Sequence, residues 1–404
     1  ATLNSNRRFN SAGMFTDAFG NTRFYDNETD NYQQDHFQLH WNEKIATNWN
    51  TNLAVFYSKG KGFYENYKEN AKFSGYGLTP IIIGGTTINK TDLIRQKWLD
   101  NDFYGTTFSA NYKDEKLDVI LGGGYNKYEG SHFGKIIWAR YSSTSELEDR
   151  YYNDAASKTD GNIFAKANYQ VAEKLSLFAD LQLRNVHYKA NGAETGVVNA
   201  NFNFFNPKAG LNLEINENNQ LYASYARANR EPNRTDYKNG SPRPEKLNDF
   251  ELGLRHVSTK VKVNANMYYM AYKDQLILTG ELDDVGAPIR KNSGDSYRLG
   301  LEIDATVAVL NNLIIRPNVT ISTNKNKDFF FKRDGVLTSL GNTNIAFSPG
   351  FIAGNIVSFV PMKNLQISFL SKFVGEQYMA NIDAEGSKLK SYFTNDLNVS
   401  YEII

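Results

Sequence analysis

Apolar and polar residues alternate along much of this chain, in segments joined by a short connection, then a long one, then a short one again. Leu175–His187, Val261–Tyr272 and Tyr297–Val307 show this alternation for most of their length. A period of two indicates β-strands with two different faces. Asn216–Asn219 is one of the short connections, and Glu65–Ile94 and Ser131–Asp160 are two of the long ones. Short turns at one end of the strands and long loops at the other are typical of a transmembrane β-barrel.

The alternation predicts about fifteen strands between Asp30 and the end of the chain. The predicted strands are 30–46, 48–63, 95–112, 116–129, 157–170, 174–189, 203–215, 220–230, 246–257, 260–275, 291–308, 312–325, 345–360, 364–377 and 391–402. Many exceed the about 5–6 residues usual in globular proteins and reach the about 9–11 residues that a tilted strand needs to cross a bilayer. Bacterial single-chain barrels have even strand numbers, so an odd number predicts that the barrel in this chain is incomplete.

The two faces of these strands predict two different surroundings. In Leu175–Leu183 every odd position is apolar, whereas Asp180 and Arg184 occupy even positions. We expect the apolar face to contact lipid and the charged face to line a wide polar interior. A soluble β-sandwich also alternates, but its strands are shorter and its turns recur about every 8–12 residues. The longer intervals in this chain therefore favour an all-β, antiparallel, up-and-down transmembrane β-barrel that forms one domain.

The composition is compatible with such a barrel and gives no support to several other classes. The 404 residues carry a net charge of +1, which gives no electrostatic case for binding nucleic acid. The chain has no cysteine, so disulfides and thiolate metal sites are excluded. Aromatic residues make up 14% of the chain and could supply the girdles of a barrel. The first residues show no signal peptide, and there is no apolar run of about 18 residues that would predict a transmembrane helix.

Seven segments, taken in order along the chain, resemble the barrel of the TonB-dependent outer-membrane receptors, in the variety that takes up iron chelates. They are Phe15–Tyr32, Gly60–Tyr64, His132–Tyr141, Arg230–Tyr237, Pro244–Gly253, Val374–Tyr378 and Tyr392–Leu397. The resemblance implies a bacterial outer-membrane barrel of about 22 strands around an N-terminal plug domain, with a TonB box ahead of the plug. The plug, the first strands and the last hairpin of that pattern are not in this sequence. Residues 1–404 are thus expected to form a partial barrel domain, with 1–29 as an extracellular loop.

The resemblance also implies a function without bond chemistry. The expected protein binds a scarce nutrient, most specifically a ferric siderophore, in its extracellular loops, and imports it with energy supplied through TonB. The implied partners are TonB, a small-molecule metal chelate, and outer-membrane lipid and lipopolysaccharide, with a surface lipoprotein as a further candidate. Importers of cobalamin, heme, peptides or glycans remain alternatives, as do a passive porin-like channel and a membrane-anchored adhesin or enzyme. The sequence contains no Gly-x-Ser-x-Gly or other nucleophile motif.

Two of the predicted extracellular loops contain arginine and aromatic residues close together in sequence. Aromatic rings and the bidentate guanidinium group are suited to a flat or anionic chelate, although packing and ion pairs between loops would need the same residue types. The candidate ligand-binding residues are His132, Trp138, Arg140, Tyr141, Arg230, Arg234 and Tyr237. No catalytic residue, no cofactor and no metal ligand is expected. His36 and His40, four residues apart on one predicted strand, would be about 13 Å apart, too far to share a metal ion.

Overall fold

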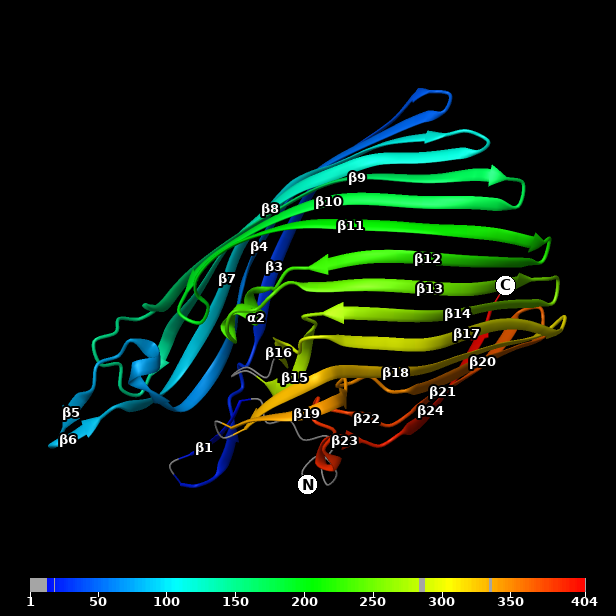
Figure 1. The fold of residues 1–404 in the computed structure, drawn as a ribbon. Helices are drawn as coiled ribbons and strands as arrows, with labels where there is room; N and C mark the ends of the chain where they lie inside the picture. Colours follow the sequence, from blue (N-terminus) through cyan, green and yellow to red (C-terminus); the bar gives the residue numbers. More distant parts are fainter. Residues whose placement is uncertain (1–12, 18, 283–287, 334–335, 404) are drawn as a thin grey trace.

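The main feature of the computed structural model is one antiparallel sheet of 16 strands, which Figure 1 shows as a single curved wall. The structure describes residues 13–403, apart from 18, 283–287 and 334–335. Along the main path of the sheet each strand pairs with the strand before it and the strand after it in the chain, and β19 (Val336–Asn344) pairs with β18 alone. Among the described residues β3 and β24 form the two edges. This connectivity confirms the predicted all-β, antiparallel, up-and-down wall.

All fifteen predicted strands are present on this path. Their bounds are β3 (Asp30–Ala46), β4 (Trp49–Lys72), β7 (Lys90–Lys113), β8 (Leu117–Ala139), β9 (Arg150–Ala172), β10 (Leu175–Gly192), β11 (Gly196–Asn216), β12 (Asn219–Arg230), β13 (Glu245–Val257), β14 (Val261–Lys273), β17 (Ser296–Leu310), β18 (Leu313–Arg333), β20 (Phe351–Met362), β21 (Leu365–Val374) and β24 (Tyr392–Tyr401).

Short elements occupy the long connections between these strands. They are the strand pairs β1 (Met14–Thr16) with β2 (Thr22–Phe24), β5 (Ile81–Ile83) with β6 (Thr86–Ile88), β15 (Leu276–Leu282) with β16 (Pro288–Asn292) and β22 (Gln377–Tyr378) with β23 (Lys388–Leu389), the helix α2 (Arg234–Lys238), and the 3-10 turns η1 (Phe73–Tyr76) and η2 (Glu385–Ser387). The predicted loop 1–29 therefore contains a two-stranded ribbon, while residues 1–12 and 18 lie outside the described residues. No helix among the described residues is long and apolar enough to cross a membrane, a finding without bearing on crossing by strands.

Tight turns of two or three residues join the strands at one end of the wall, as predicted (Figure 1). These turns are 47–48, 114–116, 173–174, 217–218, 258–260, 311–312 and 363–364. Polar side chains close them: the Asp114 carboxylate accepts hydrogen bonds from the backbone N–H groups of Lys116 and Leu117 at 2.9 and 2.8 Å. Asp and Asn favour turns because their side chains bond to nearby backbone in this way.

At the other end, the predicted loops 65–94 and 131–160 are wrong in large part, because β4, β7, β8 and β9 continue through them as strands. Two irregularities in register, near Lys68 and Ile94, break the alternation that would have indicated strand. The extended strands are held by a small apolar core, which we call the tip core. It consists of Phe73, Leu78, Leu93 and Ile136, all at most 7% exposed. Burying these side chains stabilises strand pairing beyond the membrane.

Aromatic side chains lie at two levels on the outer, apolar face of the sheet, more densely at the upper level. The upper row contains Phe37, Tyr57, Tyr104, Tyr125, Phe205, Tyr225, Phe250, Tyr269, Tyr297, Phe351, Phe373 and Phe393, and the lower row Trp49, Tyr112, Tyr169, Phe359 and Tyr401. From Tyr57 down to Trp49 is eight residues, or about 26 Å at 3.3 Å per residue. Because barrel strands tilt by about 35–45°, this length spans about 20 Å across the membrane, near the apolar band of about 25 Å that an outer-membrane barrel presents to lipid between its aromatic girdles.

Candidate functional site

The helix α2 lies beyond the upper girdle and carries two of the predicted ligand-binding residues, Arg234 and Tyr237. The Asn233 side chain accepts a hydrogen bond from the backbone N–H of Asp236 at 3.1 Å, and the Asp236 carboxylate accepts one from the backbone N–H of Asn233 at 2.8 Å. This capping box stabilises the first turn of a helix. It therefore fixes the positions of Arg234 and Tyr237 relative to each other.

Arg234 contacts the inner face of the barrel wall. Its Nη2 atom lies 2.8 Å from Oδ2 of Asp154 on β9, whose residue surface is only 4% exposed. The other oxygen of Asp154 accepts a hydrogen bond from the backbone N–H of Ala193 at 3.0 Å. His132 on β8 is the cross-strand neighbour of Asp154. The fold thus brings together His132 and Arg234, which the sequence placed in two separate groups.

His132 is a neutral imidazole at neutral pH. Burial, together with the positive charges of Arg234 and Lys238, lowers its pKa to about 4, although Asp154 acts in the opposite direction. Burial disfavours the charged form of any ionisable group. A neutral imidazole keeps one N–H donor and one nitrogen acceptor, so His132 can pair with a hydroxyl or an amide.

Tyrosine side chains surround Arg234. Tyr188 on β10 stacks on Tyr237 with ring centroids 5.4 Å apart and an interplanar angle of 25°. Burial raises the pKa of Tyr128, Tyr152 and Tyr188, while the guanidinium group of Arg234 acts to lower each of them. These phenols therefore keep their protons at neutral pH. They present flat rings with hydroxyl groups around a permanent positive charge.

The charges in this part of the wall do not balance. Glu194, between β10 and β11, forms ion pairs with Lys238 and, at 3.9 Å, with Lys97. The cations Lys97, Arg234 and Lys238 face the carboxylates of Asp154 and Glu194, so the group carries a net charge of +1 when His132 is neutral. We call this group the Arg234 cluster; it consists of Lys97, Tyr128, His132, Tyr152, Asp154, Tyr188, Glu194, Arg234, Tyr237 and Lys238.

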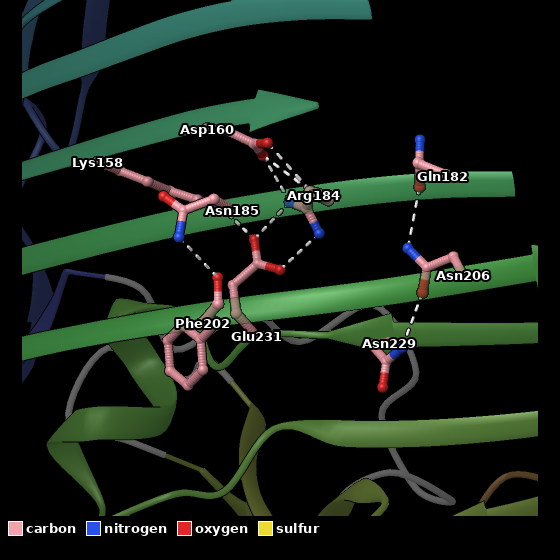
Figure 2. Close-up of polar contacts among 9 residues, drawn as sticks. All are labelled: Lys158, Asp160, Gln182, Arg184, Asn185, Phe202, Asn206, Asn229 and Glu231. Atoms are coloured by element: carbon pink, nitrogen blue, oxygen red, sulfur yellow. Dashed lines mark hydrogen bonds and ion pairs between the residues drawn. The ribbon is translucent and has the colours of Figure 1, made fainter. Parts of the chain in front are cut away.

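An ion-pair network holds the segment between β12 and α2 against the wall (Figure 2). The Glu231 carboxylate accepts hydrogen bonds from Arg184 at 2.8 and 2.9 Å and from Lys158 at 2.5 Å. Arg184 also binds Asp160, through Nε at 3.0 Å and Nη2 at 2.5 Å. Burial opposes ionisation of Glu231, but Arg184 and Lys158 hold its pKa down at about 2. Because Glu231 precedes Arg234 by three residues, this network positions α2.

Three other candidate residues lie apart from the Arg234 cluster. Trp138 is 45% exposed near the end of β8, where its ring stacks on Tyr67 with centroids 6.5 Å apart. Arg140 forms an ion pair with Asp92 at 2.9 Å. Tyr141 packs against the tip core. Trp138, Arg140 and Tyr141 therefore take part in packing and ion pairing within the wall, the role that was the alternative to ligand binding.

Arg230, the last residue of β12, links neighbouring elements of the wall. Its Nη2 atom donates to Oε2 of Glu245 on β13 at 3.1 Å and to the backbone oxygen of Leu276 on β15 at 3.3 Å. Glu245 is the cross-strand partner of Arg230 and also accepts from the backbone N–H of Leu276 at 2.8 Å. These bonds attach the β15–β16 hairpin to the wall.

The prediction that the candidate residues belong to loops is wrong for three of the seven, which lie on strands, and right for the other four, which lie in the connections between strands. His132 and Trp138 lie on β8, Arg230 on β12, and Arg234 and Tyr237 in α2, whereas Arg140 and Tyr141 follow β8 in irregular structure. The pairing of β8 with β7 and β9 continues above the girdle and accounts for the first two. Within the residues that the structure describes, no group of three His, Asp or Glu side chains could hold a metal ion.

Sequence reasoning missed Asp154, Tyr188, Glu194 and Glu231 as members or supports of the site. Tyr188 had a usable signal, because it follows the inward, even positions of β10 past the last lipid-facing leucine, Leu183. The others had none: they lie in or beside segments predicted as loops, where the sequence gives no register.

The chain matches known outer-membrane receptors in sequence pattern and in fold. The family model for "TonB dependent receptor-like, beta-barrel" matches residues 1–404. The closed form of the ferric-catecholate import receptor Fiu from E. coli K12 is similar, with a TM-score of 0.66, 16% identity and coverage of 95% of this chain and 60% of that one. The copper transporter OprC has a TM-score of 0.71 at 14% identity, over 92% of this chain and 57% of OprC.

The unliganded ferric citrate transporter FecA is a third similar structure, with a TM-score of 0.64, 16% identity and coverage of 92% of this chain and 54% of FecA. No curated protein matches the chain by sequence. The chain thus spans between about half and three fifths of the length of these solved receptors. With an outer face built for lipid and a family model that covers its whole length, the chain belongs to the TonB-dependent receptor β-barrel family, whose members are transporters of the bacterial outer membrane and not enzymes.

Proposed function

We propose that the protein containing this chain binds an anionic nutrient chelate, most specifically a ferric siderophore, at the Arg234 cluster and imports it with TonB-coupled energy. The observation that carries the proposal is the composition of the cluster. It combines a surplus positive charge with four tyrosine rings and a neutral histidine, on the inner face just beyond the lipid-facing band.

Each of these groups suits a chelate of this kind. Arg234 is permanently charged and has N–H groups beyond the one that contacts Asp154, so it can donate to a second carboxylate or phenolate. The partly exposed ring of Tyr237, backed by the buried ring of Tyr188, offers a surface for stacking with an aromatic ligand. His132 adds a neutral hydrogen-bonding group without altering the charge.

The imported ligand and the partners are the finer part of the proposal. Among the similar structures, Fiu imports a ferric catecholate, FecA transports ferric citrate and OprC transports copper. A ferric siderophore agrees with the positive, aromatic character of the cluster, while cobalamin, heme, peptides and glycans are the competing cargoes. TonB is the proposed source of energy, and a surface lipoprotein is a further proposed partner.

The test pairs a binding-site variant with a charge-balanced control. Arg234→Gln removes the surplus charge but leaves Asp154 buried without its cation. Arg234→Gln with Asp154→Asn removes that unpaired carboxylate and returns the net charge of the cluster to +1, so it isolates the loss of the guanidinium group. Both are introduced into the whole receptor in a strain that lacks other iron-chelate receptors. We expect each to reduce uptake of radioactive iron from an anionic chelate by at least about tenfold, while Arg140→Gln leaves uptake close to wild type.

The outcomes separate the competing functions. Uptake that is unchanged in both Arg234 variants would remove the Arg234 cluster from the proposal. Loss of cobalamin or heme use with intact use of ferric chelates would replace the iron assignment. Uptake that continues in a strain without TonB would favour a passive channel.

A further inference from the structure

Three polar side chains lie side by side on the outer face of β20, β21 and β24, the neighbouring strands that Figure 1 colours orange to red. They are Asn355, Ser371 and Asn395, and Ser371 is the cross-strand partner of both asparagines. They share the outward face with Phe369, which lies two residues before Ser371 and is 43% exposed. We call these three residues the polar row.

The polar row lies between the upper and the lower aromatic girdle. Asn355 is four residues from Phe351 in the upper girdle and four residues from Phe359 in the lower one, all on β20. With a rise of about 3.3 Å per residue and a strand tilt of about 35–45°, four residues span about 10 Å across the membrane. Ser371 and Asn395 each lie two residues below a phenylalanine of the upper girdle. Asn355 is therefore near the middle of the hydrocarbon layer, where water cannot solvate its amide.

Such polar residues are absent from this depth on the outer face of other strands of the wall. On β10 the outward positions between the girdles are Leu175, Leu177, Ala179, Leu181 and Leu183, and on β17 they are Leu299, Leu301, Ile303, Ala305 and Val307. A surface that meets only hydrocarbon is expected to continue this apolar pattern. The polar row on β20, β21 and β24 therefore indicates a different neighbour at this part of the wall.

The hydrogen-bonding groups of the polar row are only partly paired within the described part of the chain. The Ser371 hydroxyl donates to Oδ1 of Asn395 at 2.9 Å, which leaves the Nδ2 group of Asn395 available as a donor. The Oδ1 atom of Asn355 is buried and accepts no hydrogen bond from a described residue. An amide without a partner is strongly disfavoured in hydrocarbon. A second protein surface with hydrogen-bonding groups at the same depth would satisfy both asparagines.

We propose that the polar row forms the centre of an interface with a second copy of this receptor, related to the first by a two-fold axis along the membrane normal. An amide offers both a donor and an acceptor, so Asn355 of one copy can pair with Asn355 of the other through two hydrogen bonds. A second copy in the same membrane has its girdles at the same heights, so its polar row lies at the required depth. The interface is on the outer face of the wall and the Arg234 cluster is on the inner face, so this proposal is independent of the proposed transport function.

The residues around Asn355 permit a second wall to approach closely. Ala353 lies two residues away on the same face of β20, and the cross-strand partners of Asn355 are Pro317 on β18 and Ser371 on β21. None of these three has a long side chain that could cover the amide. Small residues beside a polar group are typical of contacts between proteins within a membrane, because they let two backbones come close enough for hydrogen bonds to form.

The first experiment tests whether two copies meet at Asn355 in the outer membrane. Asn355→Cys is introduced into the whole receptor, freed of any other cysteine, and the cells are treated with copper phenanthroline. The matched control is Ala265→Cys, which faces outward on β14 four residues from Tyr269 of the upper girdle and so lies at the same depth. We expect at least about tenfold more disulfide-linked dimer from Asn355→Cys, because a disulfide needs two Cα atoms within about 7 Å. Equal yields from the two variants, or a cross-link to a protein of different mass, would overturn the proposal.

The second experiment asks whether the amide itself holds the two copies together. Asn355→Leu removes its donor and its acceptor and suits a lipid-facing position, whereas Asn355→Gln keeps both groups. Energy transfer between fluorescently labelled whole receptors in lipid vesicles measures the dissociation constant of the dimer. We expect Asn355→Leu to raise this constant by at least about tenfold and Asn355→Gln to change it by less than about threefold. A wild type without a dimer, or an unchanged constant in Asn355→Leu, would contradict the proposal; heat-modifiable migration in gels checks that each variant is folded.

Discussion

At the scale of single residues, charge placement explains how a short helix becomes part of the candidate site. The Glu231 carboxylate joins Arg184 and Lys158 and so fixes the start of the segment that carries Arg234. Removing one member of a buried network leaves the others without compensation. The sequence suggested Arg234 as a ligand-binding residue because arginine suits anions, but the partner that orients it lies on another strand, where only the fold could place it.

His132 gives a pH dependence whose direction follows from its environment. Its pKa in the folded protein is about 4, below the ordinary value of 6.5. The folded state therefore holds fewer protons than the unfolded state between these values, and the stabilisation present above pH 6.5 is lost as the pH falls toward 4. We expect His132→Gln to flatten the fall in the free energy of unfolding between pH 7 and pH 4, measured by urea unfolding in lipid vesicles. Identical pH profiles for variant and wild type would show that His132 is not buried as a neutral ring.

At the scale of elements, strand existence was predictable and strand length was not. Every predicted strand is present because one face must satisfy lipid and the other a polar interior, which imposes a strict period of two. Above the upper girdle that requirement ends. There the tip core stabilises the extensions of β4, β7, β8 and β9, and two shifts in register interrupt the alternation of apolar and polar residues. A single sequence does not reveal which residues pair across strands there, so these extensions were predicted as loops.

Gly62 tests the pairing of β3 with β4. A Cβ added at this position would lie 2.1 Å from the backbone oxygen of Asn31 and 2.6 Å from Cα of Tyr32, so backbone atoms of β3 would have to move. We expect Gly62→Ala to lower the free energy of unfolding by about 1–3 kcal/mol. Gly161→Ala, which meets no close atom, should change it far less. Urea unfolding of the receptor in vesicles measures both, and equal effects would argue against close β3–β4 contact at Gly62.

At the scale of the whole molecule, the sequence was sufficient for orientation but not for the site. Alternate short and long connections indicated which end of the wall holds tight turns, and the aromatic rows place the membrane between them. The Arg234 cluster, in contrast, draws on β7, β8, β9, β10 and α2, and only His132, Arg234 and Tyr237 among its members were predicted. Its remaining residues belong to the cluster because of contacts with residues distant in the chain, and the alternation of apolar and polar residues does not predict those contacts.

The absence of cysteine in this chain permits a direct test of the orientation. Glu146→Cys lies beyond the end of β8, and Glu217→Cys lies in the tight turn between β11 and β12; both residues are exposed. We expect a membrane-impermeant maleimide to label Glu146→Cys on intact cells, and Glu217→Cys only after the outer membrane is permeabilised. The reverse labelling pattern would invert the orientation of the barrel.

The extended strands also make the rim of this barrel lopsided. From Tyr57 at the upper girdle, β4 continues fifteen residues to Lys72, or about 50 Å along the strand, whereas β12 ends five residues beyond Tyr225, or about 17 Å. The side of the wall at β4 therefore extends far above the membrane, whereas the side at β12 ends close to it. A bulky object that approaches the cell surface is therefore expected to meet the long strands first, and the side at β12 is the lower entrance for a small solute.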